Sequence, residues 1–450
     1  MLRRDSRHQE PNFINLKGST AYLRLLKCGC ETCCGLACWA VVGVKSGQRV
    51  IKMTGISRVA ALVAILIQLP FVQRIWILLK LGLAIGRVLQ PLSDFTSYEC
   101  RRIQDPLLQA CEDLWLSEAT RQLFLACSDS DSRTKWMPNE AKFEFAERST
   151  RDAIIVMDLE TLEFKSTSMS DFPGTAGDGI INFTGFTAVD VEGGAVKFFV
   201  TNFRPSLDSG GEFVPVQAVV GGNATLEVFK LLPNTDILQH VRTIADPAVA
   251  TPNRVAVAEG QGLYLTNDHG QYRTGWRTML SPILLTGDVT FCPQDSSIPC
   301  RIVSEGYGYP NGLIRSRVDG LIYVPRSAQG GITVLRPTAD NSLEIVHEID
   351  LPYVVDNLSE DQDGFLWAAV IPRGIEIMKQ SNDPHKYFPS STIFKISRED
   401  AGRFVTEKVL EDRDGSVLPG TTTVVHDTKT RRLFLGGAFS PFITICDAVK

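Results

Sequence analysis

The sequence has no long basic segment and no strong excess of either charge. Its 450 residues include 46 Lys and Arg against 51 Asp and Glu, which gives a formal net charge of −5 and a pI near 5.8. Proteins whose main partner is nucleic acid usually carry a basic patch, so this balance argues against that partner. Hydrophobic residues make up 44 % of the chain and the mean hydropathy is +0.01, which excludes global disorder.

An uninterrupted apolar run of membrane-spanning length is also missing. The cleanest apolar stretch, Val59 to Val72, has 14 residues and contains Gln68. A spanning helix needs about 20 residues. An extension of the stretch to Leu79 supplies that length only by including Gln73 and Arg74. The segment is therefore a marginal membrane span.

We nevertheless expect residues 53–90 to be an uncleaved signal-anchor, because no convincing small-residue cleavage site follows the apolar stretch. Residues 55–86 would then contact membrane lipid in a single pass, with the rest of the protein in the secretory lumen or outside the cell. An amphipathic helix on the membrane surface is the alternative. Basic residues flank both ends of the segment, so the positive-inside rule leaves the orientation open.

The first 52 residues differ from the rest of the chain in their cysteine content. Five of the eleven cysteines fall within the run CGCETCCGLAC. Zinc modules use two separated ligand pairs and no second half follows, while lipidated cysteines are another possibility. Because Met53 opens a conventional signal-anchor, we treat residues 1–52 as an extension, disordered or produced by a wrongly assigned start. We assign them no function.

Short strand signals recur along the rest of the chain, where helical patterning is sparse. Successive signals lie 44 to 75 residues apart, and each follows a polar or glycine-containing turn. A propeller blade takes about 40–50 residues, and insertions lengthen it. Six signals therefore predict an all-β, six-bladed β-propeller over residues 91–450, and a pair of β-sandwiches is the alternative. The signals are LFLAC from Leu123, FFVTN from Phe198, LYLTND from Leu263, LIYVP from Leu321, FLWAAV from Phe365 and LFLGG from Leu433.

Acid or amide residues precede four of these signals by nearly the same distance. Glu112, Asn253, Asn311 and Asp356 lie 9 to 11 residues before their strand signals, and Asn357 adjoins the last. Equivalent positions of successive blades face the central axis, so these side chains would converge there. Two carboxylates and three amides suit Ca²⁺, which binds hard oxygen ligands. Taken singly, each of these residues is a common turn or cap residue.

Five blocks of the chain resemble the paraoxonase/arylesterase family in the expected order, over about 350 residues. The resemblance implies a six-bladed propeller with two axial calcium ions that hydrolyses lactones, aryl esters and some organophosphates. It also implies an N-terminal hydrophobic anchor. The blocks are CEDLWL (Cys111–Leu116), PNRVAVAEGQGLYLTNDH (Pro252–His269), EGYGYPNGL (Glu305–Leu313), LPYVVDNLSEDQDGFLWAA (Leu351–Ala369) and the C-terminal LPGTTTVVHDTKTRRLFLGGAFSPFITIC.

The same resemblance implies a disulfide between Cys100 and Cys446, which requires an oxidising compartment. Cys292 and Cys300, in CPQDSSIPC, could form a second, local bridge. The sequons at Asn182 and Asn223 are compatible with secretion. Asn357 also begins a sequon, but the resemblance assigns it to the metal.

The chain departs from the family at the histidines that the resemblance implies for lactone hydrolysis. Thr184 occupies the position of the base, Phe203 that of its supporting histidine, and Ile371 that of a further pocket histidine. None of these side chains accepts a proton near neutral pH. Of the six histidines, we expect only His269 near the axis, where a structural role in a turn is the alternative.

The second calcium site of the family is altered as well. Glu112 and Asp113 resemble the family's Glu-Asp calcium pair, but Arg254 stands where an aspartate would help Asp113 to hold the second ion. A guanidinium repels a cation and can pair with a carboxylate, so we predict an Arg254–Asp113 ion pair in place of that ion. The alternative is that Arg254 turns to solvent and the carbonyl of Phe186 completes a weakened calcium site.

Three functions remain open, and the fold alone does not choose among them. The first is a calcium-dependent hydrolase of small hydrophobic esters or lactones, in which one axial Ca²⁺ polarises the carbonyl. The others are a non-hydrolytic cyclase or isomerase and a propeller that only binds small molecules. Candidate catalytic residues are Glu112, Asp356, His269 and Thr184. Candidate metal ligands are Glu112, Asp113, Asn253, Asn311, Asp356 and Asn357.

Overall fold

The computed structural model describes residues 69–258, 260–399, 402–418 and 420–449. All of these residues belong to one unit of the chain, Ile65–Lys450. The predictions made for residues 1–52 and for the first part of the 53–90 segment lie outside the described residues.

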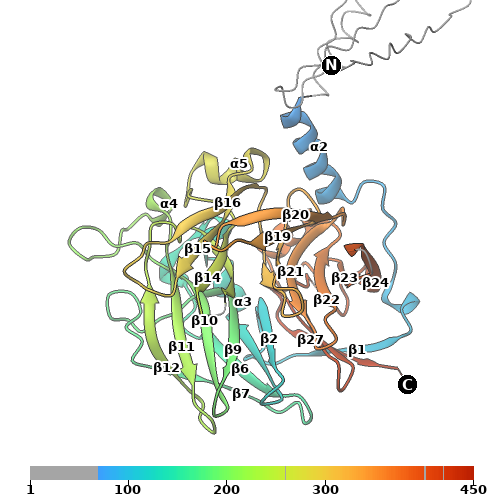
Figure 1. The fold of residues 1–450 in the computed structure, drawn as a ribbon, viewed down its shortest axis with the longest axis horizontal. Coiled ribbons are helices and arrows are strands. Elements are labelled where there is room, and N and C mark those ends of the chain that lie inside the picture. Colours follow the sequence, from blue (N-terminus) through green and yellow to red (C-terminus); the bar gives the residue numbers. More distant parts are fainter. Residues whose placement is uncertain (1–68, 259, 400–401, 419, 450) are drawn as a thin grey trace, which may run out of the picture. The chain divides into compact units, whose positions relative to one another are not determined.

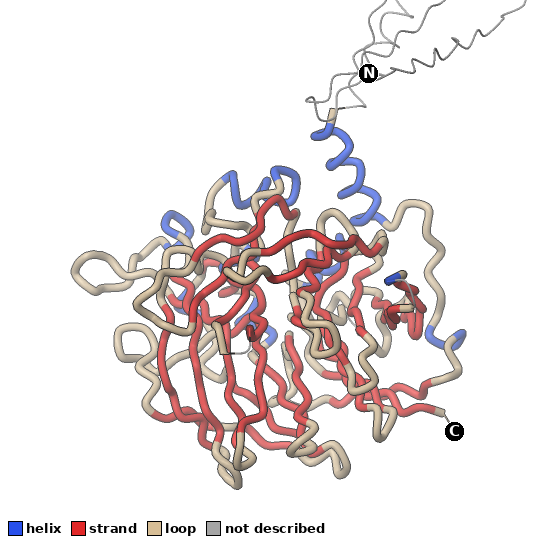
Figure 2. Tube along the Cα trace, in the orientation of Figure 1, coloured by secondary structure: helices blue, strands red, loops and turns tan. Residues whose placement is uncertain are grey.

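Six β-sheets account for most of the described secondary structure, and their strands run side by side in Figures 1 and 2. The first three sheets have the strand orders β2-β3-β6-β7, β8-β12-β11-β10-β9 and β13-β14-β15-β16. Their strands are β2 (Asp113–Ser117), β3 (Gln122–Cys127), β6 (Ala153–Asp158), β7 (Phe164–Ser166), β8 (Ser168–Ser170), β9 (Phe183–Val191), β10 (Ala195–Arg204), β11 (Asn223–Leu231), β12 (Ile237–Ile244), β13 (Pro252–Ala258), β14 (Gly262–Asn267), β15 (Gly287–Pro293) and β16 (Arg301–Tyr307).

The other three sheets have the orders β17-β18-β19-β20, β21-β22-β23-β24 and β1-β27-β26-β25. Their strands are β17 (Ile314–Arg315), β18 (Ile322–Pro325), β19 (Ile332–Pro337), β20 (Leu343–Ile349), β21 (Val354–Glu360), β22 (Leu366–Ile371), β23 (Ser391–Arg398), β24 (Phe404–Asp412), β25 (Thr423–Asp427), β26 (Arg432–Gly436), β27 (Ile443–Ala448) and β1 (Tyr98–Ile103). A small hairpin of β4 (Trp136–Met137) and β5 (Lys142–Phe143) stands apart from them.

The first strand of each blade faces the propeller axis. Strands β2, β9, β13, β17, β21 and β25 each lie at one edge of their sheet, and they contact one another in a closed ring. The six strand signals of the sequence are the second strands β3, β10, β14, β18, β22 and β26, whose side chains are mostly buried on both faces. The predicted six-bladed all-β propeller is therefore confirmed.

The last blade is completed by the N-terminal strand. Strand β1 pairs antiparallel with β27, and the pair Cys100–Cys446 in that register forms a disulfide across 346 residues. A bridge that closes so long a loop restricts the unfolded chain strongly. The disulfide implied by the family resemblance is confirmed, as is the local bridge Cys292–Cys300.

A third disulfide was not predicted. Cys111 and Cys127 are bonded at the open end of the β2–β3 hairpin, with both side chains buried. Every cysteine among the described residues is thus in a disulfide. The bridge adjoins Glu112 and fixes the main chain there.

Helices occupy the connections between strands, and α4 and α5 lie at the same end of the sheets in Figure 1. Pro70 opens α2 and Ala84, in a left-handed conformation, ends it; α2 contacts α5 and α6. Within the residues that the structure describes, no helix is long and apolar enough to cross a membrane. The predicted membrane helix is thus not confirmed. The helices are α2 (Pro70–Leu83), α3 (Ser130–Arg133), α4 (Gln217–Val220), α5 (Trp276–Leu284), α6 (Gly374–Gln380), η1 (Leu92–Asp94), η2 (Pro138–Glu140) and η3 (Phe145–Glu147).

Candidate functional site

The oxygen-bearing residues predicted to converge on the axis lie on or just before the first strands of four blades. Glu112 precedes β2, Asn253 is the second residue of β13, and Asn311 precedes β17. Asp356 and Asn357 follow one another on β21, where a register irregularity interrupts the pairing with β22. All five residues are buried, with exposed fractions between 2 % and 8 %.

Several of these oxygens have no hydrogen-bond partner. The Oδ1 atoms of Asn311 and Asn357 are buried and unpaired. Asp356 forms neither a hydrogen bond through its carboxylate nor an ion pair with any described residue. Burial raises its pKa well above the usual value, and the negative charges of Glu112 and Glu140 add to the shift. Buried polar groups without partners are costly, and no cationic side chain of the described residues forms an ion pair with Asp356.

Glu112 has a cationic partner that the sequence did not reveal. Arg133, at the end of α3, forms a buried ion pair with the Glu112 Oε2 atom. The same guanidinium donates through Nη2 to the carbonyl of Phe183 at 3.0 Å. Burial raises the pKa of Glu112 to about 7, and Arg133 opposes that shift. One oxygen of this predicted metal ligand is therefore already held.

Arg254 is paired with Asp113, as the sequence predicted. The Nε atom lies 2.8 Å from Asp113 Oδ2, and the two side chains are 4 % and 0 % exposed. Arg254 also donates to the carbonyls of Leu358 and Phe186. The ion pair is confirmed, and the alternative in which Arg254 turns to solvent is wrong. A guanidinium thus occupies the surroundings of Asp113 in which the family resemblance implied a second ion.

Two further carboxylates, neither of them predicted, lie beside this set. Asn139, on η2, donates through Nδ2 to Asp268 Oδ2 at 3.2 Å, while the buried Oδ1 of Asp268 has no partner. Burial raises the pKa of Asp268 to about 7, although hydrogen bonds to the carboxylate lower it. Glu140, which follows Asn139 on η2, accepts a hydrogen bond from the Tyr309 hydroxyl. Although Glu140 as a residue is exposed, desolvation of its carboxylate raises its pKa.

Tyr309 responds to the negative charges of this region. Burial and the negative charge of Glu140 raise the pKa of Tyr309 well above its usual value. The charges of Asp268 and Asp356 add to that shift. Of the three carboxylates, Glu140 is the one that the Tyr309 hydroxyl contacts directly.

His269 lies at this end of the propeller, with both ring nitrogens occupied. Its Nε2 atom donates to the carbonyl of Asn139 at 2.7 Å, because a carbonyl can only accept. The Nδ1 atom is then the acceptor for the Ser281 hydroxyl at 2.5 Å. Burial lowers the pKa of His269. These contacts favour a structural role, and the catalytic role stays a prediction.

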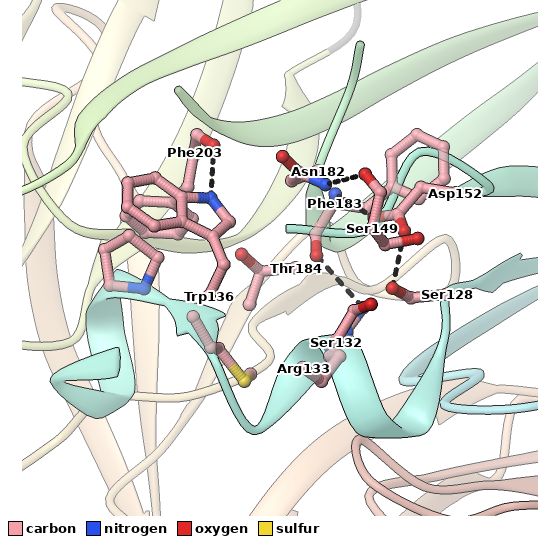
Figure 3. A pocket seen from close by; sticks show the side chains of 12 residues that line it. Ser128, Ser132, Arg133, Trp136, Ser149, Asp152, Asn182, Phe183, Thr184 and Phe203 are labelled. Carbon is pink, nitrogen blue, oxygen red and sulfur yellow. Dashed lines mark hydrogen bonds between the residues drawn. The ribbon is translucent and has the colours of Figure 1, made fainter. Parts of the chain in front are cut away.

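A small cavity marks the position at which the family resemblance implied the histidine pair. It has a volume of about 10 Å³, which is room for a single water molecule. Thr184 and Phe203 line it, and the buried Thr184 Oγ1 atom has no hydrogen-bond partner (Figure 3). Trp136 closes one side and donates to the carbonyl of Phe203 at 3.1 Å. Ile371, the third substituted position, is buried at the end of β22.

A larger cavity of about 570 Å³ lies around the opposite ends of the six inner strands. Arg254 lines it, so the ion pair with Asp113 adjoins both this cavity and the axial set of oxygens. The buried acid of this cavity, Asp361, already accepts hydrogen bonds from His426 Nδ1 and Trp367 Nε1, each at 2.8 Å. We therefore place the candidate site at the end with the unpaired oxygens.

The donor set fits one divalent cation and not two. Among the described residues no group of three or more His, Cys, Asp or Glu side chains is arranged to hold a metal. The unpaired oxygens of Asp356, Asn311 and Asn357 nevertheless have the chemistry that Ca²⁺ prefers. At Asp113 the guanidinium of Arg254 already supplies a positive charge, which would repel a second cation.

Comparisons with known proteins point to one family. Residues 213–446 match the family model described as Arylesterase. The chain is 27 % identical over 220 residues to serum paraoxonase/arylesterase 2 of Gallus gallus, a match that covers 48 % of this chain and 59 % of that protein. It is 26 % identical to serum paraoxonase/arylesterase 1 of Homo sapiens over 258 residues (54 % and 68 %) and to that of Mus musculus over 294 residues (64 % and 74 %). The match to the chicken protein thus spans less than two thirds of its length.

Proposed function

The chain belongs to the arylesterase family, and on that premise we propose that it hydrolyses small hydrophobic carboxylic esters or lactones with the help of one axial calcium ion. The observation that carries the proposal is the pair of buried Oδ1 atoms of Asn311 and Asn357 beside the buried residue Asp356, none of which has a hydrogen-bond partner among the described residues. A bound cation would offset the cost of burying them.

The residues that would hold the ion are Asp356, Asn311, Asn357 and Asn253, with the oxygen of Glu112 that Arg133 leaves free. When bound, calcium supplies a Lewis acid that polarises the substrate carbonyl and offsets the negative charge of the oxyanion. Arg133 fixes Glu112 through its second contact with the Phe183 carbonyl. The protein itself therefore orients the Glu112 carboxylate.

The small cavity at Thr184 shapes the substrate side of the site. A threonine hydroxyl does not take a proton near neutral pH, so Thr184 would orient a water molecule and not act as a base. Phe203 and Trp136 form an apolar wall on one side of this water-sized cavity. The acid–base roles proposed for Glu112 and Asp356 remain open to test.

The proposal is tested with the purified full-length chain on phenyl acetate and on aromatic and aliphatic lactones, with calcium or with EGTA. We expect hydrolysis that EGTA abolishes and that Asp356→Asn loses. The matched control is Asp288→Asn, because Asp288 is buried but already accepts hydrogen bonds from Asn267 and Thr290. Activity that EGTA leaves unchanged would contradict the calcium dependence.

A non-hydrolytic cyclase or isomerase, or a propeller that only binds small molecules, is the second candidate. The buried Phe203 and Ile371 favour it, because they replace proton acceptors by hydrocarbon. A protein that binds calcium but hydrolyses none of the esters and lactones would favour this candidate.

We further propose that the propeller lies in an oxidising compartment of the secretory pathway or outside the cell. Three disulfides support this location, since reducing compartments keep thiols free. Contact with membrane lipid through residues 55–86 remains part of the proposal.

A further inference from the structure

A hydrolase needs a group that takes the proton of the attacking water, and the histidines of the family are absent here. We propose that Glu140 is the general base of this chain and that Tyr309 positions it. The inference rests on the proposed ester or lactone hydrolysis.

Glu140 is held over the axial site by its neighbours on η2. The Asn139 carbonyl accepts a hydrogen bond from His269 Nε2 at 2.7 Å, and the Asn139 amide donates to Asp268 at 3.2 Å. Both partners follow strand β14, so η2 is fixed against that blade. The next side chain, Glu140, then meets the Tyr309 hydroxyl from the loop before β17. These contacts fix Glu140 between two blades.

The other carboxylates of the cluster are occupied or enclosed. Glu112 is paired with Arg133, and Asp113 with Arg254. Asp268 is fully buried, and Asp356 is almost so. Glu140 is exposed and forms no ion pair with any residue of the described part of the chain. It is therefore the residue of the cluster with the largest exposed fraction.

The Glu140 carboxylate is tied to the loop that carries one of the proposed calcium ligands. Tyr309, which donates a hydrogen bond to Glu140, lies two residues before Asn311 on the loop ahead of β17. The carboxylate therefore lies beside that loop, where the substrate carbonyl would be polarised. A base at that place can act on a water molecule beside the carbonyl carbon.

Tyr309 provides the positioning. Its backbone lies in the left-handed region, at φ 55°, which is uncommon for a bulky residue. The Ser327 amide holds the loop by donating to the Tyr309 carbonyl at 3.1 Å, and the His269 ring meets the Tyr309 ring edge-on at 5.1 Å. The Tyr309 hydroxyl donates to Glu140 Oε1, which leaves the Oε2 atom for water.

The substrate, one water molecule and the Glu140 carboxylate supply every atom and proton of the proposed step. Glu140 takes one proton from water while the water oxygen bonds to the carbonyl carbon. The bond between that carbon and the leaving oxygen then breaks, and Glu140 returns the proton to the leaving oxygen. The products are a carboxylic acid and an alcohol, or a hydroxy acid from a lactone, and no oxidant or further reactant is needed.

The test compares Glu140→Ala and Glu140→Gln with Glu144→Gln in the full-length protein, using phenyl acetate and a lactone. Glu144 is the matched control, because it is an exposed acid on the same segment with only a surface partner, Lys135. Both Glu140 variants should lose about 10²–10⁴-fold in kcat, the range typical of a general base. Glu144→Gln should keep the parent rate. Tyr309→Phe should lower kcat more than it changes KM.

Two measurements separate a base from a structural residue or a metal ligand. Added formate should restore activity to Glu140→Ala, because a small carboxylate can take the place of the missing one, and it should not affect the parent. Calcium binding, measured by calorimetry, should be the same in Glu140→Gln and the parent. A Glu140→Gln variant that hydrolyses at the parent rate would overturn this inference alone. A Glu140 variant that loses activity because it no longer binds calcium would overturn this inference as well. A parent that hydrolyses nothing would overturn the proposed function together with it.

Discussion

Removal of Arg254 tests the interpretation of the ion pair at the axis. The Arg254 and Asp113 side chains are 4 % and 0 % exposed, so Arg254→Ala leaves a buried carboxylate without its partner. Such a loss costs about 3–5 kcal/mol. For a folded unit of about 380 residues, with an unfolding entropy of roughly 2.1 cal/mol/K per residue, this corresponds to a fall in Tm of about 4–6 °C.

The assay is urea and thermal denaturation of the full-length protein in EGTA. The surface pair Arg403–Glu399 gives the control, since Arg403→Ala should change the stability by less than about 1 kcal/mol. The double variant Arg254→Met with Asp113→Leu should be more stable than Arg254→Ala, because neither charge is then left unpaired. When calcium is added, Arg254→Asp should bind a second equivalent and gain more stability than the single equivalent gives the parent. An Arg254→Ala protein as stable as its parent, or two calcium equivalents in the parent, would refute the reasoning.

Three further predictions concern neighbouring groups. The pKa of Asp268 is raised in the folded protein to about 7, so its contribution to stability should be present below pH 4 and be lost as the pH rises to 7. In EGTA, Asp268→Asn should flatten the dependence of the unfolding free energy on pH over this range. An unchanged pH dependence would contradict the assignment. His269→Gln should retain most of the hydrolysis, because both nitrogens of His269 already serve structural contacts, and complete loss with calcium still bound would make it the base. In a secreted preparation, Asn223→Gln should remove a glycan, and Asn182→Gln should not, because the Asn182 amide is buried and donates to the Ser149 carbonyl at 2.9 Å; mass spectrometry of the two variants decides.

The sequence predicted the elements that repeat. The second strand of each blade is buried on both faces, and its apolar run after a turn gives a regular signal, as in LYLTND of β14 and LFLGG of β26. The residues ahead of the first strands could be located because they lie at a fixed distance from that signal. The Arg254–Asp113 pair could be predicted because Arg254 stands where the family resemblance implied an acid beside Asp113. In that position the favourable arrangement of a guanidinium is an ion pair with the carboxylate.

The partners on irregular segments could not be predicted in this way. Arg133 and Glu140 lie on short helices of the connection between β3 and β6, and Tyr309 lies on the loop before β17. No periodicity marks these residues, and their partners are fixed only when separate blades meet. The disulfide Cys111–Cys127 did leave a signal, since Cys127 ends the strand signal LFLAC and Cys111 stands beside the candidate ligand Glu112.

The central claim is that one calcium ion on the propeller axis supports hydrolysis. The most direct measurement follows phenyl acetate hydrolysis by the full-length protein as free calcium is raised from EGTA-buffered levels, with bound calcium measured in the same samples. The rate of hydrolysis should rise in proportion to the first equivalent of bound calcium and then saturate. Asp356→Asn should neither bind calcium nor hydrolyse the ester. Hydrolysis without bound calcium, or one bound equivalent with no hydrolysis of the ester, would contradict it.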